Sequence, residues 1–204
     1  MEPLTPEEIR VLGCLIEKER TVPDSYPLTL NALTGACNQT SNRDPVVSYE
    51  PFEVEGALMQ LRSRGLTRVV HSPSNRAEKY RHVVGEAFGL EADVLAVLAV
   101  LLLRGAQTVN ELRTRTERYE PGVDDVEAAL RVLASRDEPL AVKLERRPGQ
   151  REERWTHLVG GDPVDVQTSA DARPVQGSSS TADRIAALEQ RVARLEDLLQ
   201  DLTS

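Results

Sequence analysis

The residue types that most often carry out chemistry are few in this sequence, and they are widely spaced. The chain of 204 residues contains three histidines and two cysteines. His71, His82 and His157 lack the H-x-x-x-H or H-E-x-x-H spacing of a metal site, and Cys14 and Cys37 belong to no C-x-x-C pair. We therefore expect no metal and no cofactor, histidines in or beside strands, and reduced thiols buried as small apolar groups.

The motifs of the common enzyme classes are also missing. The sequence has no G-x-S-x-G elbow, no glycine-rich phosphate loop before a helix, and no pair of carboxylates with separable acid and base roles. We therefore predict that the protein is not an enzyme.

Basic side chains collect in two segments whose composition is typical of β-hairpins. Exposed cations on a hairpin can bind the phosphates of nucleic acid. The candidate nucleic-acid-binding residues are Arg68, Arg76, Lys79, Arg81, Lys143, Arg146, Arg147, Arg151 and Arg154. Glu145, Glu152 and Glu153 are interleaved with the second group, so a solvated hairpin of mixed charge is an equal alternative.

A second candidate surface is the polar loop over residues 38–45. Its candidate recognition residues are Asn38, Gln39, Asn42, Arg43 and Asp44. A recognition role predicts that Gln39 and Arg43 are exposed. A scaffolding role predicts that Asn42 and Asp44 bond to nearby backbone, as Asx turns do.

These segments must be positioned by helices, and the first helix has a clear start. Thr5, Pro6 and Glu8 form a capping box with proline at the first helical position. Further helices are predicted over about 29–37 and 50–64, the last with Val54, Leu58 and Leu61 on one face. Strands are predicted over 66–70 and 79–84. Three helices followed by a hairpin is the order of a winged helix.

The same order recurs in the next part of the chain. VEGALMQLRSR at 54–64 matches VEAALRVLASR at 126–136, and Thr108 with Glu111 repeats the capping box. The apolar run at 94–103 predicts a buried helix, and strands are predicted over 140–144 and 154–159. The fold class is therefore mainly α with small β-hairpins (α+β), in two tandem winged-helix domains over 1–84 and 85–159.

The rest of the chain has a different character. Residues 160–182 have the composition of a flexible linker, and residues 183–204 have the heptad pattern of a short coiled coil. The candidate dimer interface consists of Ile185, Leu188, Val192, Leu195, Leu199 and Leu202. The charges beside this seam favour a parallel homodimer, and the alternative is a helix that packs onto its own chain.

The sequence is similar to a known bacterial family. The stretch YPLTLNALTGACNQTSNRDPVVSYEPFEVEGALMQLRSRGL at 26–66 resembles the YceH family of uncharacterised proteins, and the resemblance continues through LLLRGAQTVNELRTRTER at 101–118 and RRPGQREERWTHLV at 146–159. The resemblance implies a tandem winged-helix fold. It brings no established activity.

Charge leaves two hypotheses about function. The third helices begin with EPFEVE at 50–55 and GVDDVE at 122–127, which places carboxylates where DNA would approach, and the net charge of the chain is −8. One hypothesis is a dimeric regulator that binds double-stranded DNA through its basic hairpins. The other is a scaffold that binds a protein partner through its acidic third helices. The sequence lacks an apolar run long enough to span a membrane and begins with an acidic helix, so we expect a cytoplasmic protein.

Overall fold

The computed structural model describes residues 2–71, 77–119, 122–146 and 150–161. Within these ranges helices predominate, and the strands form small antiparallel groups, which confirms the predicted α+β class. The candidate residues Arg76 and Arg147, the linker beyond residue 161 and the coiled-coil segment 183–204 lie outside the described residues. No helix among those described is long and apolar enough to cross a membrane.

The first half contains the three predicted helices and the predicted hairpin. Its helices are α1 (Pro6–Thr21), α2 (Leu30–Cys37) and α3 (Pro51–Ser63), with a short 3-10 turn at Pro23–Ser25, and its hairpin strands are β2 (Thr67–Val70) and β3 (Lys79–His82). The capping box is present, since the Thr5 hydroxyl accepts from the Glu8 amide and the Glu8 carboxylate accepts from the Thr5 amide at 2.7 Å.

The second half repeats this order. Its helices are α5 (Ala92–Arg104), α6 (Val109–Thr116) and α7 (Val126–Ala134), and its strands are β4 (Ala141–Lys143) and β5 (Trp155–His157). Its capping box is also present, with the Glu111 carboxylate 2.8 Å from the Thr108 amide. A short helix that the sequence pattern did not predict, α4 (Val84–Phe88), connects the halves.

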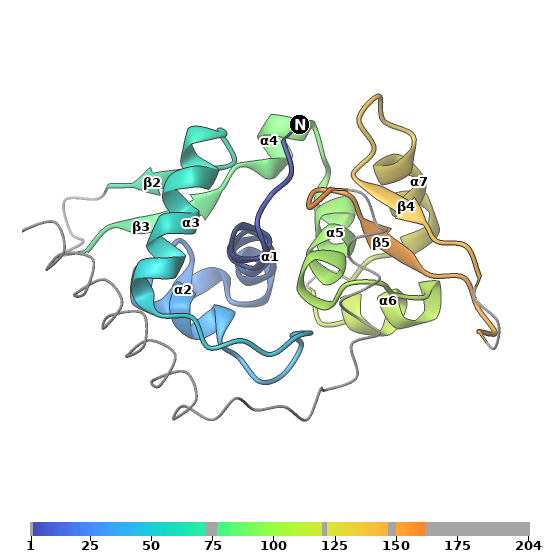
Figure 1. Ribbon diagram of the computed structural model, residues 1–204, viewed down its shortest axis with the longest axis horizontal. Helices are drawn as coiled ribbons and strands as arrows, with labels where there is room; N and C mark the ends of the chain where they lie inside the picture. Colours follow the sequence, from blue (N-terminus) through green and yellow to red (C-terminus); the bar gives the residue numbers. More distant parts are fainter. Residues whose placement is uncertain (1, 72–76, 120–121, 147–149, 162–204) are drawn as a thin grey trace, which may run out of the picture. The chain divides into compact units, whose positions relative to one another are not determined.

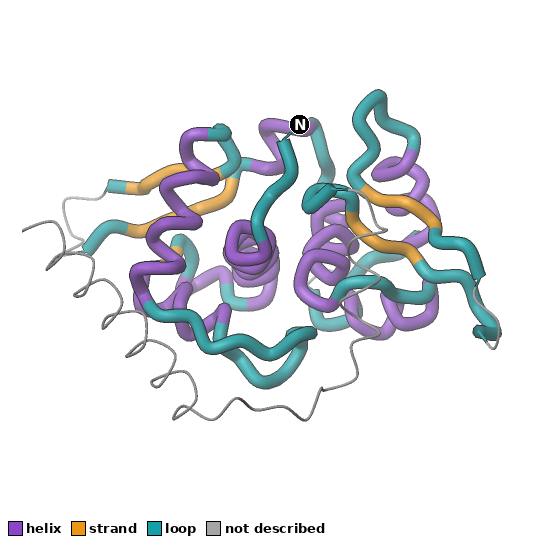
Figure 2. The backbone as a smooth tube through the Cα atoms, viewed as in Figure 1, coloured by secondary structure: helices purple, strands orange, loops and turns teal. Residues whose placement is uncertain are grey.

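One more strand interaction occurs in each half, directly before its second helix. The strand β1 (Leu28–Thr29) pairs antiparallel with β3, which gives the sheet order β1-β3-β2. In the second half, Gln107 forms a single antiparallel bridge to Trp155 of β5. Figure 2 shows the strands gathered in these two places. One or two residues are too few to show the alternation of a strand, so the sequence pattern gave no sign of them.

Helices α1 and α5 form the centre of the core. They lie side by side (Figure 1), and a Cβ atom on Gly13 of α1 would lie 3.0 Å from a Leu103 methyl group of α5. All residues from Val94 to Leu103 are buried, which confirms the predicted buried helix. All the described residues belong to one compact unit, so the two halves share a core. The division into two domains at residues 84 and 85 stays a prediction.

Candidate functional site

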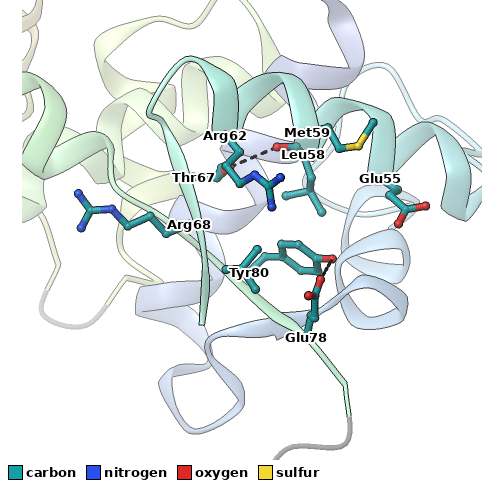
Figure 3. A pocket seen from close by; sticks show the side chains of 9 residues that line it. Glu55, Leu58, Met59, Arg62, Thr67, Arg68, Glu78 and Tyr80 are labelled. Carbon is teal, nitrogen blue, oxygen red and sulfur yellow. Dashed lines mark hydrogen bonds between the residues drawn. The ribbon is translucent and has the colours of Figure 1, made fainter. Parts of the chain in front are cut away.

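The first half has a groove between its third helix and its hairpin. We call this the first groove, and its volume is about 170 Å³ (Figure 3). It is lined by Glu55, Leu58, Met59, Arg62, Thr67, Arg68, Val69, Glu78 and Tyr80. Of these residues, only Arg68 was a candidate from the sequence.

Helix α3 positions one wall of the first groove. Its inward face buries Val54, Leu58 and Leu61, as the sequence predicted. Because residues seven apart lie on the same face of a helix, Phe52 and Met59 both project from the opposite, outward face. Their exposed fractions are 72% and 58%, the highest of any large apolar residues in the described ranges. The outward face of α3 is therefore partly apolar.

The strands β2 and β3 form the floor of the first groove, and the charged residues Arg68 and Glu78 lie toward its two ends. The Tyr80 hydroxyl donates to the Glu78 carboxylate at 3.1 Å, and burial, followed by the effect of Glu78, raises the pKa of Tyr80. Figure 3 shows Glu55 and Glu78 at the end near the Tyr80 hydroxyl and Arg68 at the other end. The first groove thus has an acidic end and a basic end, with Leu58, Met59 and the cation of Arg62 between them.

The second half has a groove in the corresponding position. This second groove, of about 550 Å³, lies between α7 and the β4–β5 hairpin. Glu127 and Leu130 stand 72 residues after Glu55 and Leu58, the same offset as between the matching helices. Trp155 takes the place that Tyr80 has in the first half. Tyr80 pairs with Leu28 and Trp155 pairs with Gln107, and each partner directly precedes the N-cap residue of the second helix of its half.

Four predicted hairpin cations belong to the first half, and one carboxylate compensates part of their charge. Arg68 and Arg81 both form ion pairs with Glu86, a residue of the unpredicted helix α4, at 2.9 Å for Arg68. Lys79 lies half-buried in β3. Because Arg68 and Arg81 share the single carboxylate of Glu86, the described part of this hairpin keeps a surplus of positive charge.

In the second half, two of the predicted cations are paired with carboxylates, and two form no ion pair within the described residues. Lys143 pairs with Glu153, and Arg154 pairs with Glu111 at 3.1 Å. Within the described residues, Arg146 donates to the Gln150 carbonyl at 3.2 Å and forms no ion pair, and Arg151 is exposed. The predicted cations are thus divided between two hairpins and do not form one surface. Arg131, Lys143, Arg146 and Arg151 line the second groove together with three glutamates.

The recognition role predicted that Arg43 is exposed, and this prediction is wrong. Arg43 is buried, and its guanidinium makes two hydrogen bonds to the Glu17 carboxylate, at 2.6 and 2.9 Å. It also donates to the Ala36 carbonyl and to the Gln39 side chain. A buried arginine of this kind holds the loop onto α1 and α2.

The remaining loop residues are held by distant partners. The Asn38 amide makes two hydrogen bonds to the Tyr49 backbone, and the Asp44 amide donates to the Leu103 carbonyl at 2.9 Å. The Asn42 side chain accepts from Arg104 at 3.4 Å. The predicted bonding of Asn42 and Asp44 side chains to nearby backbone is therefore not what orders this loop. Two charged residues among the buried positions of α1 hold this loop: Glu17 binds Arg43, and Arg10 donates to the carbonyls of Cys37 and Pro45.

The histidines and cysteines do not gather into a site. His71 is exposed, His82 bonds to Glu19 at 2.8 Å, and burial lowers the pKa of His157 to about 4. Cys14 and Cys37 are buried free thiols, as expected. Among the residues that the structure describes, no cluster of histidine, cysteine and carboxylate side chains could hold a metal ion.

Comparison with known proteins gives the family of the chain. Residues 4–150 match the family model described as "Protein of unknown function, DUF480". The chain is 50% identical over 192 residues to a UPF0502 protein of Geobacter metallireducens, covering 93% of this chain and 85% of that protein. It is 44% identical over 203 residues to a UPF0502 protein of Mesorhizobium japonicum, covering 98% and 96%. None of these names denotes an enzyme. The chain therefore belongs to the DUF480/UPF0502 family of uncharacterised bacterial proteins, of which YceH is a member.

Proposed function

We propose that the protein is a non-enzymatic binding module whose first groove receives a segment of a partner protein. The observation that carries this proposal is the exposure of Phe52 and Met59 on the outward face of α3. Large apolar side chains that project together beside a groove are typical of protein interfaces, where they become buried on binding.

The chemistry of the first groove indicates the kind of segment that it fits. Leu58 and Met59, between its two ends, suit an apolar side chain of the partner. The carboxylates of Glu55 and Glu78 favour a basic residue at one end, and Arg68 favours an acidic residue at the other. We therefore expect a partner segment in which an apolar residue stands between a basic and an acidic one.

The charge of α3 favours protein over nucleic acid at this site. Glu50, Glu53 and Glu55 lie in and around its first turn, where phosphates would approach a recognition helix. Glu50 and Glu53 form a capping box, which explains their presence structurally. Their negative charge still repels DNA, whereas a protein segment with a basic residue is attracted.

The second candidate function is binding of double-stranded DNA through the second groove. It is favoured by Arg146 and Arg151, exposed cations that do not form an ion pair within the described residues. Glu152 and Glu153 beside them reduce the local surplus of positive charge. This function is therefore the weaker of the two.

Assembly and location complete the proposal. We expect a cytoplasmic homodimer in which residues 183–204 pair in parallel, so that each assembly presents two first grooves. Leu195→Asp then halves the solution mass measured by light scattering while the circular dichroism of the helices in residues 2–161 is kept. A mass that does not change excludes this pairing.

A peptide-display selection tests the protein-binding function. The full chain is used to select from a random peptide library, and selected peptides are measured against the variant Phe52→Ala/Met59→Ala. We expect peptides with the basic–apolar–acidic pattern, and a loss of affinity of at least tenfold in the variant, about 1.4 kcal/mol. Val132→Ala, an exposed apolar residue of α7, is the matched control. Peptides that bind the double variant as tightly as the parent contradict the proposal.

A further inference from the structure

A small polar cavity lies where the two halves meet. We call it the junction niche. It is lined by Glu17 and Asn42 from the first half and by Val100, Leu103, Arg104, Arg115, Arg118 and Tyr119 from the second half. Its volume of about 10 Å³ corresponds to one water-sized group. The niche is separate from both grooves.

Three buried hydrogen-bond donors of the junction niche have no acceptor within hydrogen-bond distance among the described residues. They are Nε of Arg104, Nη1 of Arg115 and the hydroxyl of Tyr119. The Tyr119 side chain is fully buried, and burial raises its pKa, so the hydroxyl is a neutral donor. The Arg118 guanidinium lies beside the Tyr119 ring, 5.6 Å from its centroid. Because buried donors are nearly always paired, three of them around one small cavity indicate a missing acceptor.

Positive charge exceeds negative charge around the junction niche. The pKa of Arg115 is lowered, first by burial and then by the repulsion of Arg104. Glu17 is the carboxylate of the niche, and it is already bonded by both Arg43 and Arg118. Arg104 reaches only the neutral amide of Asn42, at 3.4 Å.

Two other carboxylates, Glu111 and Asp44, act on Arg115 and leave this surplus in place. Glu111 lies 3.9 Å from Arg115 but 3.1 Å from Arg154, so two guanidinium groups share one negative charge. A water molecule in the niche would accept at most two hydrogen bonds and would bring no charge. An anion would bring a negatively charged acceptor to these donors and would reduce the repulsion between Arg104 and Arg115.

We propose that the junction niche binds a small anion through a single negatively charged atom, which is either a chloride ion or one oxygen of inorganic phosphate. The bound anion contacts Arg115 and Tyr119 of the second half beside Glu17 and Asn42 of the first half. It therefore stabilises the contact between the halves, whatever binds in the grooves.

The first experiment is a thermal unfolding titration of the full chain. The reference buffer contains HEPES, a sulfonate that is too bulky for the niche. Sodium chloride or sodium phosphate is added in its place at constant ionic strength. We expect a saturable increase of the unfolding temperature, roughly 2 to 8 °C at 10 to 100 times the dissociation constant. The anion that saturates at the lower concentration is the preferred one. A temperature that does not depend on the anion shows that the niche holds water, and it overturns the proposal.

Matched variants separate specific binding from general salt effects. Tyr119→Phe removes one donor oxygen from a buried site, and Arg115→Gln removes one charge; each should lose at least half of the anion-dependent increase. Arg113→Gln removes the same charge from the exposed side of α6 and should keep the whole increase. An equal increase in all proteins overturns the proposal. If Arg115→Gln does not fold, the result for Tyr119→Phe, which is nearly isosteric with the parent, decides whether the proposal stands.

Discussion

The two halves of residues 2–161 place equivalent helices and hairpins in equivalent arrangements, yet their outward surfaces differ. Counting 72 residues on from Phe52 and Met59 gives Asp124 and Arg131, so the apolar residues of the first half correspond to charged residues in the second. The inward residues Leu58 and Leu130 stay the same. Packing fixes the buried positions of a repeat, whereas exposed positions are free to diverge toward different partners.

The central helices differ in their interior as well. Aligned through Glu8 and Glu91, Glu17 of α1 corresponds to Val100 of α5. Glu17 is fully buried in an ion pair with Arg43, while Val100 packs among apolar side chains. The first half therefore depends on a buried charge pair for which α5 has an apolar residue.

The hairpins contain a third difference between corresponding residues. His82 and His157 occupy equivalent positions, two residues after Tyr80 and Trp155. His82 contacts the Glu19 carboxylate at 2.8 Å, and this hydrogen bond lowers the pKa of Glu19. His157 is buried, and desolvation alone lowers its pKa.

The largest predicted effect concerns the buried ion pair. Glu17→Ala leaves the Arg43 guanidinium buried without its carboxylate, so we expect a loss of about 3–5 kcal/mol in the free energy of unfolding. Urea denaturation measures it. The double replacement Glu17→Leu/Arg43→Met should cost much less, because no unpaired charge remains. The exposed control Glu55→Ala should change stability by less than about 0.5 kcal/mol. A loss below about 1 kcal/mol for Glu17→Ala contradicts the importance of this pair.

The next effect comes from giving the first groove the residues of the second half. Phe52→Asp/Met59→Arg should lower the affinity for selected peptides by about 100-fold, because it removes both apolar contacts and adds charges that must be desolvated. Isothermal titration calorimetry measures the change. The fold should be unaffected, since both positions are exposed. Unchanged affinity would show that the outward face of α3 is not the binding surface.

A smaller effect distinguishes the two histidines by pH. Burial lowers the pKa of His157 to about 4, whereas histidine in an unfolded chain titrates near 6.5. The unfolded chain therefore takes up a proton that the folded protein does not, and stability present above pH 6.5 is lost as the pH falls toward 4. Between pH 7 and pH 5, we expect a loss of about 2 kcal/mol from this residue.

Urea denaturation at the two pH values measures this loss. His157→Gln should remove it, whereas His71→Gln, at an exposed position, should keep it. If His157→Gln shows the same pH dependence as the parent, His157 is not the group responsible.

The smallest effect tests the second groove. If the second half binds duplex DNA, Arg146→Glu/Arg151→Glu should weaken binding at 100 mM salt by about tenfold and reduce the slope of log affinity against log salt by about 2. Arg113→Gln, which removes one charge that is paired with Glu127, is the control. Fluorescence anisotropy over a salt series measures both quantities. Equal salt slopes for the parent and the double variant would show that Arg146 and Arg151 do not bind DNA. The two halves would then differ in binding at the first groove alone.

Much of this arrangement could be predicted from local sequence. The capping boxes at Thr5 and Thr108, the buried run at 94–103 and the order of helices and strands depend on neighbouring residues and on helical periodicity, both of which the sequence shows directly. The outward position of Phe52 and Met59 could have been recognised in the same way, because residues seven apart share a helix face.

The long-range contacts could not be predicted in this way. The burial of Arg43 depends on Glu17, which lies 26 residues earlier, and the pairing of Arg68 and Arg81 depends on a helix that has no start signal in the sequence. The sequence by itself determined the six main helices and the two hairpins of the described residues, their repetition and the family. Only the tertiary structure decided which charged side chains are neutralised and which remain available, because the free energy of a charge depends on the groups that surround it in space.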